Sequence, residues 1–302
     1  MADTNTTSLA IVAESTFGTT PADGFKFIRT TGESLNFNIN NTQSAEIRAD
    51  RNIQDIIRTD ASASGDINFE LSYGAFDDLL EGLMCADYSS DVLINGITKK
   101  SFSIEKKFEL GGTDRYHLFK GMRVSSMSLD LSAGDIVSGA FSFIGKEMTA
   151  ATSATDSTIT AATTAPIMNA VNNVVQLQEG GSTLSDSVMS LSLTVENNLR
   201  TQNAIGSLGA VGIGLGEFNV SGSMSVYFSS GSIFNKFLNG TDSSIQFQLS
   251  DGSNSYTFLI PKVEYTSGSV TAGSTNSDVM AEMEFTGKFD ATTAGSLKIT
   301  RA

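Results

Sequence analysis

Apolar and polar residues alternate in two segments of the chain that repeat each other at a separation of 156 to 158 residues. The first segment is Ser34–Asn41 and the second is Ser190–Asn197. A period of two predicts strands with one face in a core. The aligned apolar pairs are Leu35 with Leu191, Phe37 with Leu193, and Ile39 with Val195.

The repeat continues beyond these strands. Each copy has a long loop, then a second alternating strand, then apolar residues at helical spacing, which predict a short amphipathic helix laid on the sheet. The motif FIGK, ending at Lys146, matches FTGK, ending at Lys288. The aligned strand residues are Gly65, Ile67, Phe69 and Leu71 with Gly222, Met224, Val226 and Phe228, and the aligned helix residues are Phe76, Leu79, Leu80 and Gly82 with Phe234, Phe237, Leu238 and Gly240.

The whole pattern predicts a mainly β chain that is a tandem duplication of one module, with one short helix per module. In the first copy we expect further strands near Lys100–Phe108, Tyr116–Phe119, Val124–Leu131 and Ile136–Gly145. In the second copy we expect strands at Val188–Val195, Phe218–Phe228, Ser244–Leu249, Tyr256–Ile260, Lys262–Ser269 and Val279–Phe289, with a helix over Ile233–Leu238.

Changes in composition predict the domain boundaries. Residues 1–33 are expected to form an N-terminal arm, 34–148 the first module and 174–302 the second. Between the modules, 149–173 is interpreted as a linker, because Thr149–Ala165 is a tract of Ala, Thr and Ser.

Composition supports a folded protein with many strands. The 302 residues are 40% hydrophobic and 17% charged, with 3 Pro and no Trp, which suits strands joined by polar turns. The lone Cys85 cannot form an internal disulfide. We find no secretory signal and no apolar run of membrane-spanning length, so a cytoplasmic origin is expected.

The net charge of −14 limits the partners. An acidic surface does not wrap DNA tightly, because affinity for phosphate comes from Lys and Arg. It would let DNA move past without sticking. Solubility alone accounts for the charge equally well.

The two long loops differ in kind. Thr42–Ser64 interleaves charges of both signs, whereas Asn198–Ser221 is apolar and glycine-rich, with Arg200 and Glu217 as its only charges. The apolar side chains suggest burial against a neighbouring subunit, or a hairpin packed on its own module. The charged residues of the first loop are Glu46, Arg48, Asp50, Arg51, Asp55, Arg58 and Asp60, and the apolar residues of the second are Ala204, Ile205, Leu208, Val211, Ile213 and Leu215.

Catalytic residue types are scarce, so we expect no enzyme, no cofactor and no metal site. His117 is the only histidine, which excludes motifs with two histidines. Asp77 and Asp78 fall in the first turn of the expected helix, where acidic residues favour the helix dipole. Gly212, Gly214 and Gly216 do not match a nucleotide-binding loop and are followed by strand-like residues.

Two long stretches resemble the tail tube (major tail) proteins of long-tailed bacteriophages. These are Glu46–Met84 and Lys100–Lys146, and the segments ESTFGTTP, starting at Glu14, and FKFIRTTGESL, starting at Phe25, are similar to the start of that family. The resemblance implies a β-sandwich or small barrel with a flanking helix, in a virion protein assembled in the host cytoplasm.

The resemblance also implies how the protein assembles. Rings would stack into a tube, the channel for DNA ejection, with other tail proteins at its ends and no specific binding of DNA. Two modules per chain favour a trimer with pseudo-sixfold symmetry, and a hexamer is the alternative. An acidic surface or adhesive β-protein is the alternative function. The residues expected at contacts between subunits or rings are Glu46, Arg48, Asp50, Arg51, Arg58, Arg200, Ile205, Leu208, Val211, Ile213 and Leu215.

Overall fold

The computed structural model describes residues 3–184, 188–229 and 231–302. The described chain is mainly β, with two short α-helices, as the alternating pattern predicts. The first half contains η1 (Thr4–Thr6), β1 (Ser8–Glu14), β2 (Lys26–Phe27), β3 (Gly32–Glu33), β4 (Asn36–Gln43), β5 (Ile56–Glu70), α1 (Asp77–Met84), β6 (Val92–Ile94), β7 (Ser101–Phe108), β8 (Arg115–Ser132), β9 (Ser138–Gly145) and β10 (Glu147–Ala151).

The second half repeats this order with a shorter connection after its helix. It contains β11 (Val174–Glu179), β12 (Ser182–Thr183), β13 (Val188–Glu196), β14 (Arg200–Gln202), β15 (Gly212–Gly214), β16 (Asn219–Tyr227), α2 (Ser232–Asn239), β17 (Ser243–Ser250), β18 (Ser255–Ala272), β19 (Val279–Gly287) and β20 (Lys298–Arg301).

Strand pairing is duplicated along with the sequence. The antiparallel order β1-β7-β8-β9-β5-β4 in the first half matches β11-β17-β18-β19-β16-β13 in the second. Irregularities in the pairing recur at matching places as well. A register shift between Val124 and Ser126 of β8 has its counterpart between Tyr265 and Ser267 of β18.

The register corrects one part of the sequence alignment. Asn36 of β4 pairs with Ser64, and Thr194 of β13 pairs with Ser221, so these strands correspond at 158 residues. Leu35 therefore matches Leu193, and the alignment of Leu35 with Leu191 was wrong by two residues. A shift of two keeps every apolar residue on the same face, so alternation alone cannot distinguish the two registers.

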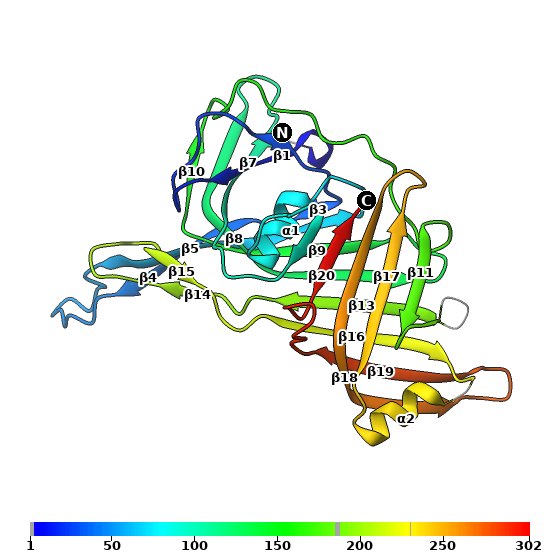
Figure 1. Ribbon diagram of the computed structural model, residues 1–302. Helices are drawn as coiled ribbons and strands as arrows, with labels where there is room; N and C mark the ends of the chain where they lie inside the picture. The colour runs from blue at the N-terminus through cyan, green and yellow to red at the C-terminus, as the bar shows by residue number, and fades with distance from the viewer. Residues whose placement is uncertain (1–2, 185–187, 230) are drawn as a thin grey trace.

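The two halves share one continuous sheet (Figure 1). The later part of β8 pairs with β13, from Ser126 opposite Glu196 to Ser132 opposite Ser190. A second junction joins β20 near the C-terminus to β6 in the first half. Buried side chains from both halves form one hydrophobic core beneath this sheet.

The helices lie where apolar residues change to helical spacing. In α1, Leu79, Leu80 and Leu83 are buried, and the C-cap residue Cys85 has a left-handed backbone. In α2, Ile233 is the buried residue, and Gly240 provides the left-handed C-cap, a position that favours glycine.

Several elements are longer than the sequence pattern predicted. The segment Thr42–Ser64 is a hairpin with a shorter tip, because β4 continues to Gln43 and β5 begins at Ile56. The strands expected separately at Tyr116–Phe119 and Val124–Leu131 are the single strand β8, and β18 likewise joins two expected strands. Irregular pairing within each strand interrupts the alternation without ending the strand.

The segments outside the expected modules also pack on the first half. β1 pairs with β7, and the main chain of Lys26 bridges to Thr160. Asp156 is buried and accepts a hydrogen bond from the amide of Phe25. The division into arm, modules and linker stays a prediction.

Candidate assembly interface

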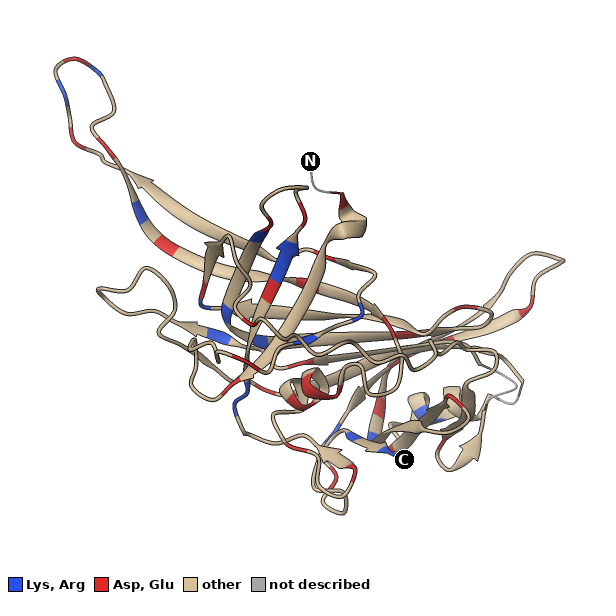
Figure 2. Cartoon of the chain, turned by 90° about the horizontal axis from the view of Figure 1, so that it is seen from above, with Lys and Arg blue, Asp and Glu red and all other residues tan. Residues whose placement is uncertain are grey.

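The β4–β5 hairpin projects from the body of the molecule (Figure 1). Its tip carries acidic and basic residues close together in the chain (Figure 2). The Arg48 guanidinium forms an ion pair with Asp50, with Nη2 and Oδ2 2.7 Å apart. This contact holds the pKa of the Asp50 carboxyl well below its usual range, although both side chains are solvated. Glu46, Arg51 and Arg58 are also exposed.

Isoleucines on the same hairpin face solvent. The exposed fraction is 97% for Ile47, 58% for Ile53, 58% for Ile56 and 54% for Ile57. Isoleucines that stay in solvent do not stabilise a loop, whereas isoleucines that become buried against a partner stabilise the contact. The charges predict the exposure of this hairpin, and these isoleucines, which the charge pattern does not reveal, are its apolar component.

The β14–β15 hairpin lies against the first half of the same chain (Figure 1). The amide of Ala61 in β5 donates to the carbonyl oxygen of Leu208 at 2.8 Å. Arg123 Nη1 of β8 donates to the carbonyl oxygen of Ile213 at 2.7 Å. Ile213 and Ala210 are consequently buried, with exposed fractions of 1% and 4%.

The expected contact residues of this hairpin are therefore divided between two environments. Ile213 is buried within the chain, and Leu215 is half-buried. Arg200 is exposed and donates to the carbonyl oxygen of Leu215 at 3.2 Å. The remaining ones face solvent and are Ile205, Leu208 and Val211.

A buried side-chain amide links the two halves by hydrogen bonds at their junction. Asn197 follows β13 and is 4% exposed. Its Nδ2 donates to the carbonyl oxygens of Leu83 at 2.9 Å and of Val124 at 3.0 Å. Its own main-chain amide donates to Ser125 at 2.8 Å, extending the β8–β13 pairing. Sequence pattern gave no signal for this residue, because an asparagine at a strand end is typical of a turn.

Among the described strands, two with an open edge are related to the internal junction by the repeat. β4 pairs there with β5 alone. The later part of β18, from Glu264 to Ala272, pairs there with β19 alone. By the repeat, β4 corresponds to β13 and this part of β18 corresponds to the part of β8 that pairs with β13. These two open edges thus belong to the counterparts of the two strands that form the internal junction.

The face of the sheet opposite the core is polar across both halves. Two rows of paired residues cross it, and neither contains Lys or Arg. Asp130 accepts a hydrogen bond from Ser192 across the strands at 2.7 Å. The first row is Glu70, Ser138, Asp130, Ser192, Ser223, Glu284 and Ser267, and the second is Asn68, Ala140, Ser128, Thr194, Ser221 and Thr286.

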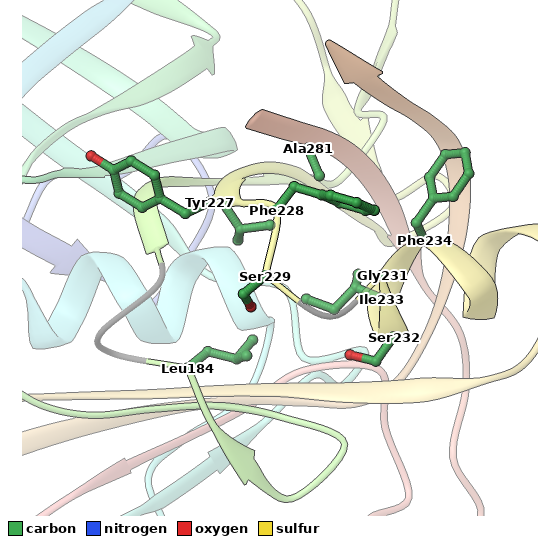
Figure 3. Close-up of a pocket in the computed structure, with 10 residues that line it drawn as sticks. Leu184, Tyr227, Phe228, Ser229, Gly231, Ser232, Ile233, Phe234 and Ala281 are labelled. Atoms are coloured by element: carbon green, nitrogen blue, oxygen red, sulfur yellow. The ribbon is translucent and has the colours of Figure 1, made fainter. Parts of the chain in front are cut away.

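A small apolar pocket lies at the start of α2 (Figure 3). Phe228, Ile233 and Phe234 line it, and Leu184 approaches from the segment after β12. Its described lining residues include no Asp, Glu, His, Cys, Lys or Arg. The pocket offers packing surface rather than acid–base groups.

The reactive side chains are poorly placed for chemistry. Burial raises the pKa of the Cys85 thiol, which disfavours the nucleophilic thiolate. Burial, followed by the charge of Lys106, lowers the pKa of His117, which packs edge-on against Phe108. The described residues contain no group of three His, Cys, Asp or Glu side chains that could hold a metal ion. None of the described helices has the length and apolar character needed to cross a membrane.

Comparison with known families agrees with this geometry. Residues 4–287 match the model of the phage tail tube protein family, and the chain belongs to that family. No curated protein matches the chain. The protein is therefore a structural component of a phage tail tube, a virion protein that assembles into tubes, and the family is not known for enzymes.

Proposed function

We propose that this protein forms closed rings in which each chain supplies two modules, and that stacked rings form the channel for DNA ejection. The internal β8–β13 junction is the observation that carries the proposal, because both of its counterpart edges are open. Unpaired edges recruit further strands unless they are blocked. Pairing β18 of one chain with β4 of the next repeats the internal junction and closes a ring in which neither of these two edges is free.

The duplicated register defines the proposed contact residue by residue. In the internal junction Ser128 lies opposite Thr194. The same register places Ser269 of one chain opposite Asn36 of the next, and Gly268 opposite Phe37. Three chains then give six similar junctions with pseudo-sixfold symmetry. A ring of six chains is the alternative.

The polar sheet face is proposed to line the channel. A wall of hydroxyl groups and carboxylates without Lys or Arg gives DNA phosphates no cation to bind. The side chains concerned belong to the two rows that cross both halves, among them Asp130 and Glu284. DNA would pass without specific binding. Other tail proteins would meet the tube at its ends, and assembly would take place in the host cytoplasm.

Cross-linking tests the register directly. Asn36→Cys/Ser269→Cys should form disulfides between chains, because paired residues of antiparallel strands have Cα atoms about 4.5–5.5 Å apart. Ser128→Cys/Thr194→Cys is the matched control and should cross-link within one chain. Asn36→Cys/Thr271→Cys is out of register by two residues and should cross-link poorly.

Electron microscopy and native mass measurement complete the test. We expect rings or hollow tubes, and rings that contain three chains. Particles that stay monomeric at high concentration, together with no cross-link at Asn36→Cys/Ser269→Cys, would refute ring closure through these edges.

A further inference from the structure

The two hairpins are equivalent positions of the repeat. Gln43 pairs with Ile56 next to the tip of the β4–β5 hairpin, and Thr201 pairs with Ile213 in the β14–β15 hairpin. Gln43 and Thr201 are related by the 158-residue offset of their strands, so Ile56 is the counterpart of Ile213. Counting back three residues from each makes Ile53 the counterpart of Ala210.

Equivalent positions have opposite exposure. Ala210 and Ile213 are 4% and 1% exposed, because their hairpin lies on the preceding half of the same chain. Ile53 and Ile56 are both 58% exposed, because no preceding module is present for their hairpin. Ile47 and its counterpart Ile205 are exposed in both hairpins, so the difference is confined to the side that docks.

The base of each hairpin has an irregular backbone at the same point. Asn198 has a φ of 44°, and beyond it the β14–β15 hairpin forms a separate two-stranded sheet. Its counterpart Asn40 lies at the register shift between Asn40 and Asn41 in β4. A bulge is a place where a strand pair changes direction. The β4–β5 hairpin therefore has a bend point where the docked hairpin turns.

The surface that receives the β14–β15 hairpin also has a counterpart. Ala61 and Arg123 contact that hairpin. Their equivalents in the second half are Phe218, which is half-buried, and Glu264, which has changed the sign of the charge.

The two receiving surfaces differ in charge. Glu264 now pairs with Lys288, at 2.8 Å between Oε2 and Nζ, and is partly exposed. The β4–β5 hairpin has charges of both signs, arginines and carboxylates, where the β14–β15 hairpin is apolar, and its basic residues are Arg48, Arg51 and Arg58. On the first surface, Arg123 donates to a main-chain carbonyl oxygen of the β14–β15 hairpin. On the second surface, the carboxylate of Glu264 would lie near the arginines of the β4–β5 hairpin.

We propose that the β4–β5 hairpin docks on the Phe218–Glu264 surface of the neighbouring copy of this chain, burying Ile53 and Ile56. The proposal rests on the proposed ring and adds to it a second, separate contact at each junction between chains. By the repeat, the amide of Phe218 then donates to the carbonyl oxygen of Arg51 of the next chain, as Ala61 donates to Leu208 within one chain.

The test compares three full-length proteins, the native chain, Ile53→Asp/Ile56→Asp and Ile47→Asp. All of these positions are exposed in the single chain, so the variants should fold. Assembly is measured by sedimentation, and the exchange of the Phe218 amide is measured before and after assembly. We expect assembly to slow this exchange in the native chain and in Ile47→Asp. In Ile53→Asp/Ile56→Asp the slowing should be lost and assembly should weaken about a hundredfold, the equivalent of two buried isoleucines.

The Asn36→Cys/Ser269→Cys cross-link separates failure of this proposal from failure of the ring. If the cross-link forms and Phe218 exchanges equally fast before and after assembly, the hairpin docks elsewhere and the proposal is wrong while the ring stands. Equal effects of Ile47→Asp and Ile53→Asp/Ile56→Asp on assembly would also overturn it. If the cross-link does not form in assembled protein, both proposals fail together.

Discussion

Replacing Asn197 should weaken the contact between the two halves of the chain and so lower the free energy of unfolding. Asn197→Ala removes two donors, at 2.9 and 3.0 Å from the carbonyl oxygens of Leu83 and Val124, at a site that is 4% exposed. Each buried acceptor left without a partner costs about 1–3 kcal/mol, and the alanine cavity admits little water to replace the donors. We expect a loss of about 2–4 kcal/mol in the free energy of unfolding.

The neighbouring asparagine supplies the matched control. Asn198 is exposed and its Nδ2 donates to the carbonyl oxygen of Glu217 at 2.9 Å, where water can replace it. Asn198→Gly removes the side chain, tolerates the φ of 44° and should cost less than about 1 kcal/mol. Urea unfolding of unassembled protein measures both variants. If both variants lose the same free energy of unfolding, or if Asn197→Ala loses less than about 0.5 kcal/mol, the side chain of Asn197 does not stabilise the junction.

Three further substitutions test the fold, each by thermal or urea unfolding. Gly65→Ala should cost more than about 2 kcal/mol, because φ is 143° and a Cβ would lie 2.5 Å from the Ser34 carbonyl oxygen; a neutral result would contradict the close approach. Tyr256→Phe should cost about 1–3 kcal/mol, because the buried hydroxyl accepts from Gly74 at 2.9 Å and donates to Asp77; an unchanged midpoint would show that these bonds are dispensable. The lowered pKa of His117 means that the unfolded chain takes up a proton first as the pH falls, so stability decreases below about pH 6.5. His117→Gln should make that decrease shallower, and an unchanged pH profile would contradict this.

The two hairpins are not interchangeable, because they fit different surfaces. One fits a surface that presents Arg123, and the other is proposed to fit a surface that presents Glu264. Exchanging Thr42–Ser64 with Asn198–Ser221 would place arginines beside Arg123 and apolar side chains beside Glu264. We expect the exchanged protein to assemble poorly, and normal tubes from it would contradict the difference between the two junctions.

Much of the local structure follows from sequence pattern. Alternation of Ile67, Phe69 and Leu71 defines the buried face of β5, because side chains in a strand alternate between two faces. The change to helical spacing after Phe76 places α1. The mixed charges from Glu46 to Arg58 predict an exposed segment, since a charged cluster is costly to bury.

Other features depended on contacts between distant residues. The register of β4 could not be read from alternation, because a shift by two leaves the same residues facing the core. The sequence also does not predict that Ile213 is buried and Ile56 exposed, because the two residues are identical and occupy equivalent positions of the repeat.

The sequence by itself determined that this chain is a duplicated, acidic, β-rich protein of the tail tube family, because those properties reside in composition, period and repeat. The tertiary structure alone decided which strands join the two halves and which edges remain open. Strand pairing is made by main-chain groups, which every residue except proline carries in the same form, so the sequence does not specify the partner directly. The burial of apolar side chains from both halves in one core selects that partner.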